Sequence, residues 1–192
     1  MRKIYVLLTL CLLSISSFSQ DKKFSIEANY PLAISNGYEK FTGIVNGSFK
    51  YRFAKSKLFQ YGASLTFDYL KSTVPFSYED LKTDYFFYHI NGFAEMNIAS
   101  AKNFHPFIGI GFTYLSYEYE FYYTYYEFDN IETRRANDLG MNFKLGAQYD
   151  FTSVFFIQTY FHYIRTFNDN NFNNETMGVN NNQLKLGLGF RF

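Results

Sequence analysis

The stretch that decides the fold is LKLGLGFRF, residues 184–192. A leucine or phenylalanine stands at every second position from Leu184 to Phe192, and lysine, glycine or arginine stands between them. In a β-strand, successive side chains point to opposite faces, so this alternation separates apolar from polar residues. The stretch therefore predicts a strand with one apolar face and one polar face.

The same alternation recurs seven more times along the chain. The predicted strands cover residues 24–33, 43–53, 59–69, 86–98, 106–114, 139–151, 155–163 and 184–192. No helical periodicity competes with this pattern after residue 20. Because eight is an even number, both ends of the strand array lie on the same side.

The predicted connections alternate in length. Short segments (54–57, 100–103 and 152–153) separate longer ones (35–41, 72–82, 119–135 and 166–182). Short periplasmic turns opposite longer extracellular loops are typical of outer-membrane barrels. The sequence therefore predicts an all-β fold, an eight-stranded antiparallel up-and-down transmembrane β-barrel. Within it, the asparagine-rich segment 168–182 is predicted to be a mobile surface loop.

The first residues are predicted to be a cleaved signal peptide. Arg2 and Lys3 precede an apolar run from Ile4 to Leu13, and Ser17-Phe18-Ser19 supplies small residues for cleavage. The apolar run is shorter than the roughly 20 residues that a membrane-spanning helix needs. We therefore expect a signal peptide at 1–19 and one barrel domain at 20–192. Cys11 lies within the apolar run, so the mature chain has no cysteine for a disulfide or a metal site.

Composition separates this chain from nucleic-acid-binding proteins. Without Arg2 and Lys3 the chain keeps 16 basic residues against 17 acidic ones, and these do not form a basic cluster. Aromatic residues make up 23%, with 19 Tyr, 25 Phe and no Trp, although the mean hydropathy is only −0.22. This combination is typical of strands with one face in lipid and the other in water.

Alternation alone leaves two solvent assignments open. In a soluble lipocalin-like barrel the apolar row points inward, whereas in a membrane barrel it points outward. The polar row is rich in glycine, serine, asparagine and charged residues, which suits a narrow lumen. Tyrosine and phenylalanine also concentrate towards the strand ends, where membrane interfaces favour aromatic rings. We therefore expect the apolar row to face lipid.

The segment 184–192 also resembles the assembly signal of outer-membrane proteins, which has a terminal phenylalanine and apolar residues at every second position before it. The matching residues are Leu186, Leu188, Phe190 and Phe192. Segments 106–112 and 145–149 resemble strands of the OmpA/OmpX-like, "porin family" small barrels. The resemblance implies an outer-membrane location, contact with lipid and lipopolysaccharide, and insertion by the barrel-assembly machinery.

The polar row contains ten ionisable residues that we expect in the lumen. They are Glu27, Lys50, Arg52, Asp68, His89, Glu95, Lys144, Asp150, Lys185 and Arg191. An eight-stranded barrel has an interior just wide enough for side chains. These residues are therefore predicted to form a structural network of ion pairs and hydrogen bonds. A gated path for ions or small solutes is the alternative.

Catalysis is a weaker interpretation, although small outer-membrane barrels include lipid A acyltransferases and deacylases. A deacylase needs a histidine beside a serine, so that the base can activate the hydroxyl. Ile164 stands where that serine would follow His162, His89 has no serine near it on its own face, and His105 is predicted at a periplasmic turn. We expect no enzymatic activity, no cofactor and no metal site.

The third long connection is unusually rich in tyrosine. Its aromatic hairpin contains Tyr117, Tyr119, Tyr122, Tyr123, Tyr125 and Tyr126. A spanning strand needs only about 9–11 residues, so this hairpin should project beyond the membrane. It is either an exposed sheet that binds an extracellular protein or glycan, or an aromatic collar against lipopolysaccharide. The predicted role is non-enzymatic, either structural or in surface interaction.

Overall fold

A computed structural model describes residues 22–34, 40–75, 80–125, 128–170 and 175–192. Its eight strands are β1 (Phe24–Ile34), β2 (Lys40–Lys55), β3 (Phe59–Val74), β4 (Leu81–Met96), β5 (Phe104–Tyr125), β6 (Phe128–Asp150), β7 (Phe155–Asn170) and β8 (Glu175–Arg191). Within these ranges, no helix has the length and apolar character needed to cross a membrane. The predicted signal peptide (1–19) and Tyr126 lie outside the described residues.

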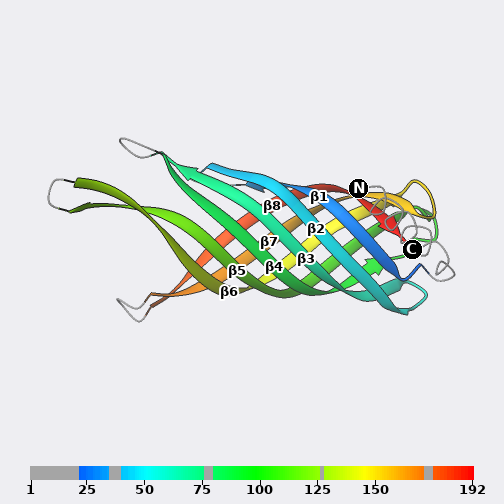
Figure 1. The fold of residues 1–192 in the computed structure, drawn as a ribbon. Helices are drawn as coiled ribbons and strands as arrows, with labels where there is room; N and C mark the ends of the chain where they lie inside the picture. Colours follow the sequence, from blue (N-terminus) through cyan, green and yellow to red (C-terminus); the bar gives the residue numbers. More distant parts are fainter. Residues whose placement is uncertain (1–21, 35–39, 76–79, 126–127, 171–174) are drawn as a thin grey trace, which may run out of the picture.

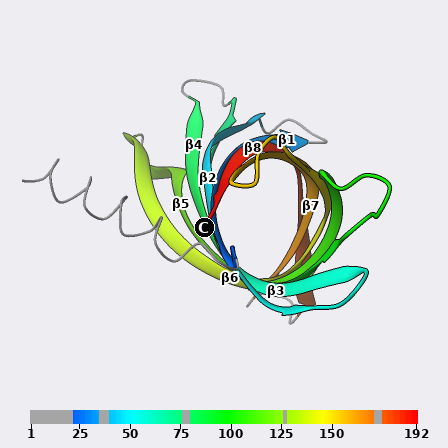
Figure 2. The ribbon, with the colours of Figure 1, turned by 90° about the vertical axis from the view of Figure 1, so that its right-hand side faces the viewer.

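The eight strands form one closed antiparallel barrel (Figures 1 and 2). Each strand pairs with its neighbours in the sequence, and β1 closes the ring against β8 with Ser25 opposite Arg191. Backbone hydrogen bonds between Phe24 and Phe192 extend this closure to the last residue. Figure 1 shows the C-terminus at one end of the barrel and the β5–β6 hairpin projecting from the other. The predicted fold is confirmed.

The inside of the barrel is mostly polar and its outside is apolar. On β3 the inward residues Ser64, Thr66 and Asp68 are buried, whereas Leu65 is 57% exposed. Other outward apolar residues are also strongly exposed, up to 72% at Phe112. A soluble protein rarely exposes a continuous apolar surface of this kind, because its contact with water is unfavourable. The lipocalin-like alternative, with its apolar row inside, is therefore wrong.

Aromatic rings pack near both ends of the apolar belt. At the end with the short turns, Phe24 stacks on Tyr51 with ring centroids 4.8 Å apart. Towards the opposite end, Tyr69 stacks on Phe86 at 5.0 Å. Along β5 the outward row is aromatic or aliphatic at 104, 108, 110, 112 and 114 and polar at Ser116, Glu118 and Glu120. The segment 104–114 has eleven residues, which match the span of one transmembrane strand.

Several predicted boundaries need correction. Ile98 was expected in a strand, but β4 ends at Met96 and the Ile98 carbonyl accepts a turn hydrogen bond from Ala101. Segments 72–82, 119–135 and 166–182 were expected as loops, yet strand pairing continues into all three. In particular, β7 runs to Asn170 and β8 begins at Glu175, so most of the predicted mobile loop is paired strand. Alternation fails beyond the membrane because both faces of these extensions meet water.

Candidate functional site

An ion cluster fills the half of the lumen nearer the short turns. The Arg52 guanidinium donates two hydrogen bonds to the Glu95 carboxylate, at 2.7 and 2.9 Å, and a third to the Ser25 hydroxyl at 3.1 Å. The Lys50 ammonium lies 2.7 Å from the Glu27 carboxylate and 4.6 Å from the centroid of the Phe107 ring. Two-point Arg–carboxylate contacts are strong and geometrically specific, so this one fixes the spacing of β2 and β4 on either side of β3.

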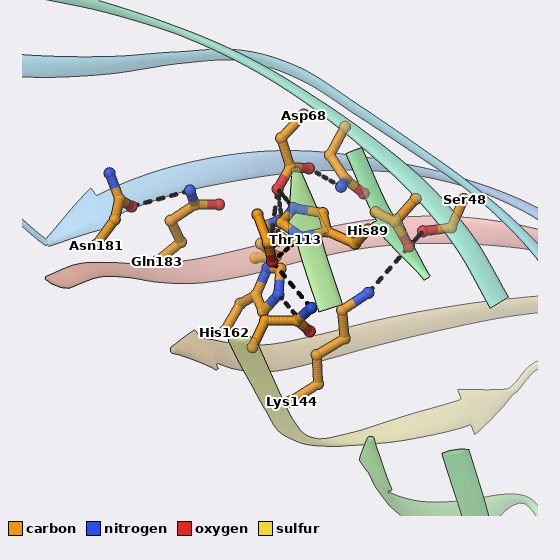
Figure 3. A network of polar contacts seen from close by, with 12 residues as sticks. Ser48, Asp68, His89, Thr113, Lys144, His162, Asn181 and Gln183 are labelled. Atoms are coloured by element: carbon orange, nitrogen blue, oxygen red, sulfur yellow. Dashed lines mark hydrogen bonds and ion pairs between the residues drawn. The ribbon is translucent and has the colours of Figure 1, made fainter. Parts of the chain in front are cut away.

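A second cluster surrounds Asp68 nearer the extracellular end (Figure 3). The Asp68 carboxylate contacts the Lys185 ammonium, the Asn46 amide and, at 3.1 Å, Nε2 of His89. Lys185 also donates to Nδ1 of His162 at 3.0 Å. All these side chains are buried. Since a buried carboxylate without partners is very unfavourable, these contacts on Asp68 hold the surrounding strands in one arrangement.

Above this cluster a group of apolar side chains enters the lumen. Leu70, Phe87, Leu115 and Ile164 pack together, and each is at most 5% exposed. Tyr85 and Tyr117 pack against the group from the extracellular side. We call these four residues the apolar layer. It separates the polar lumen below from the extracellular mouth, so the described lumen is filled by side chains rather than open along its length.

The structure places all ten expected lumen residues on the inner face. Eight belong to the two clusters or lie between them, where Lys144 donates a hydrogen bond to the Thr66 hydroxyl at 2.9 Å. Asp150 and Arg191 instead pair at 3.0 Å near the rim with the short turns, and both are partly exposed. Sequence reasoning missed the four residues of the apolar layer because each occupies a position of the polar row.

One arrangement in the upper cluster resembles a catalytic relay. The Thr113 hydroxyl lies 2.8 Å from Nδ1 of His89, and Nε2 of His89 faces Asp68. However, Thr113 is only 1% exposed, and its oxygen also lies 3.0 Å from the donating amide of Asn142. A nucleophile needs space for its substrate, and the apolar layer closes the lumen above this group. The relay geometry is therefore that of a structural hydrogen-bond chain.

The same cluster corrects one step of the sequence reasoning, which found no close histidine and carboxylate spacing. Asp68, His89 and His162 come from three strands, and their potential ligand atoms lie within 4.8 Å of one another. His and Asp are suitable metal ligands. The Lys185 ammonium already contacts both Asp68 and His162, so a protein cation occupies the position that a metal ion would take. The residues present do not fit a metal centre.

Outside the membrane, β5 and β6 form a ribbon, which we define as residues 117–125 and 128–136, and β4 pairs with it only as far as Thr83 opposite Tyr119. The two strands pair from Tyr117 opposite Ala136 to Tyr125 opposite Phe128. Pairing between β6 and β7 begins only at Leu139 opposite Phe167. From Phe128 to Asp138, the edge of β6 that faces away from β5 pairs with no strand among the described residues. The ribbon therefore presents a long free strand edge.

The described side chains of the ribbon are both aromatic and charged. Arg135 pairs with Glu118, and the Arg134 guanidinium lies 4.9 Å from the centroid of the Phe121 ring. Tyr117 and Tyr119 pack with ring centroids 5.8 Å apart. Tyr123 and Tyr125 belong to β5, but their side chains lie outside the described part of the structure. The ribbon thus combines aromatic surface with exposed charge.

The closed ring, the apolar belt between aromatic girdles and the filled polar lumen define a class, the small eight-stranded outer-membrane barrels. The chain belongs to the outer membrane protein beta-barrel domain family, whose model matches residues 5–192. A search of curated proteins gave no match. The protein is therefore an integral protein of the outer membrane, and the resemblance to OmpA/OmpX-like small barrels is confirmed.

Solved structures of outer-membrane proteins share this fold at low sequence identity. OprG from Pseudomonas aeruginosa is 13% identical with a TM-score of 0.57, and the match covers 88% of this chain and 95% of that one. A major outer membrane protein from Thermus thermophilus is 12% identical with a TM-score of 0.54, covering 88% and 98%. Ail of Yersinia pestis, the attachment invasion locus protein, solved with the heparin analogue sucrose octasulfate, is 17% identical with a TM-score of 0.52, covering 88% and 96%.

Proposed function

We propose that this protein is a non-enzymatic surface-interaction barrel, whose β5–β6 ribbon binds an extracellular protein by accepting an extended segment along the free edge of β6. The proposal depends on one observation: β6 pairs with β5 over a longer stretch than it pairs with β7. Its pairing with β5 continues to Phe128, but its pairing with β7 stops at Leu139. An unpaired edge offers backbone donors and acceptors that an added strand can use.

The side chains along this edge suit a reversible partner rather than aggregation. Glu132, Arg134 and Arg135 are exposed beside Ile131. Charged residues on an edge strand discourage uncontrolled pairing with other edges. A partner segment with complementary charges would still pair, because backbone hydrogen bonds provide affinity and side chains provide selectivity.

The lumen argues against the channel alternative. Both ion clusters cross the lumen, and the apolar layer closes it above Asp68. A small solute would have to displace buried ion pairs, whose disruption leaves charges without partners. We assign these residues to holding the barrel in one shape. Likewise, we assign outward-facing Leu186, Leu188, Phe190 and Phe192 to recognition by the barrel-assembly machinery.

Two separate variants, Thr133→Pro and Arg134→Pro, test whether the partner binds along the free edge of β6. Backbone groups of successive strand residues point to opposite sides, so one of the two prolines removes an N–H from the free edge and leaves the β5 pairing intact. We expect that variant to keep a folded, protease-resistant ribbon and to lose binding of displaying cells to an immobilised extended peptide of complementary charge. The matched control, Arg165→Ala on β7, should bind normally. Binding to heparin alone, or unchanged peptide binding by the edge variant, would overturn the proposal.

A further inference from the structure

We propose that the lipid-facing wall of β1–β4 carries a specific binding site for one fatty acyl chain, centred on Gly47. A depression of about 690 Å³ lies on this wall. Its outward-facing lining is apolar and comprises Ile26, Gly47, Phe49, Leu65, Phe67, Tyr88 and Ile90. This site is independent of the ribbon and of the proposed function.

The depression exists because Gly47, which has no side chain, lies among large residues. Gly47 pairs with Ala28 of β1 on one side and with Phe67 of β3 on the other. One step along the strands, Ile26 pairs with Phe49, and both are well exposed. Gly47 therefore forms the floor, and the larger side chains form the walls. A Cβ atom placed on Gly47 has no other atom within 4 Å, so the floor opens directly outward.

The depth of the floor in the membrane indicates which kind of molecule fills the depression. Ala28 lies four residues along β1 from Phe24, which packs in the aromatic girdle, and four residues from the exposed Leu32 on the other side. At about 3.4 Å per residue, Ala28 and its register partner Gly47 lie about 14 Å along the strand from either flank, within the hydrocarbon region. At this depth the barrel wall is surrounded by lipid acyl chains.

The chemistry of the lining agrees with that position. The charged residues that contribute to this wall, Glu27 and His89, turn their side chains into the lumen. The outward lining therefore offers only apolar contact and ring surface. A headgroup would find no counter-charge at this depth, whereas a hydrocarbon chain would fill the depression and gain dispersion contacts. The ligand class is a saturated or monounsaturated acyl chain of a membrane lipid.

The absence of tryptophan from the chain makes a direct test possible. Phe49→Trp places a single fluorophore in the wall of the depression, and Ile108→Trp places one outside it. The two positions have matched depths, because each lies four residues from an aromatic residue near the short turns, Phe53 or Phe104. Both variants are folded in detergent micelles and titrated with a phosphatidylcholine that carries a dibrominated acyl chain. We expect saturable quenching at Phe49→Trp near one lipid per protein, and only a gradual, non-saturating decrease at Ile108→Trp.

A second experiment fills the floor of the depression with a side chain. Gly47→Leu in the Phe49→Trp background should abolish the saturable phase, because the leucine side chain occupies the position of the acyl chain. Gly92→Leu is the matched control, since Gly92 also faces open space but does not line the depression. It should leave the saturable phase unchanged. Equal, non-saturating quenching at both tryptophans, or a saturable phase that survives Gly47→Leu, would overturn the proposal. Heat-modifiable gel mobility verifies that every variant is folded.

Discussion

Asp68 is the residue on which the upper half of the lumen depends. Its carboxylate contacts Lys185, His89 and Asn46, which come from β8, β4 and β2. These partners compensate for the loss of water around a fully buried anion. Because Lys185 lies 117 residues further along the chain, one carboxylate links β8 to β2, β3 and β4.

Replacing Asp68 by Asn should therefore be costly. The amide leaves the buried Lys185 ammonium without a counter-ion, and breaking a buried ion pair in this way costs about 3–5 kcal/mol. Asp84→Asn is the matched control, because the Lys71–Asp84 pair spans 3.5 Å with both side chains well exposed. That change should cost at most about 1 kcal/mol. Urea unfolding from lipid vesicles measures both, and equal losses of stability would contradict the assigned role of Asp68.

At the residue scale, the sequence predicted which side chains enter the lumen but not how they pair. Alternation along β3 or β4 is a local property, so Asp68 and His89 were both expected inside. Their contact with Lys185 depends on strand tilt and stagger around the closed ring, which no single strand encodes. For the same reason the Asp68, His89 and His162 group was not predicted, since its members are separated by 21 residues or more.

At the element scale, the strands are longer than their apolar alternation. β5 alternates cleanly to Tyr114, where its outward row leaves the apolar belt, yet its pairing with β6 continues to Tyr125. Lipid imposes the alternation, whereas backbone hydrogen bonds propagate the pairing. The tyrosine-rich hairpin was correctly expected to project, but its strand content and the free edge of β6 became visible only from the register.

The ribbon should be dispensable for folding. Deleting residues 118–135 and joining Tyr117 to Ala136 through an Asn-Gly turn keeps a paired hairpin end, because these two residues are register partners. We expect the shortened protein to insert into vesicles and to show the same heat-modifiable mobility as the full chain, since the transmembrane pairs are unchanged. Loss of the folded band would show that the ribbon stabilises the barrel, and its assignment to partner binding would fail.

At the scale of the whole molecule, two solvents determine the structure. The outward rows meet hydrocarbon, whereas the inward rows satisfy one another through ion pairs and hydrogen bonds across the lumen. A closed ring leaves no unpaired strand edge within the membrane, which a lipid environment requires. The free edge of β6 occurs only beyond the apolar belt, where water solvates it.

The most direct test of this solvent assignment is a spin-label scan along β5. Single cysteines from 107 to 114, placed in a chain whose only cysteine, Cys11, is replaced by serine, are labelled and the protein is folded into lipid vesicles. We predict high collision rates with oxygen, which is concentrated in lipid, at 108, 110, 112 and 114, and low collision rates with both oxygen and a water-soluble nickel chelate at 107, 109, 111 and 113. Oxygen contact at the odd positions, or contact with the nickel chelate at the even ones, would contradict a barrel with lipid outside and a sealed polar lumen.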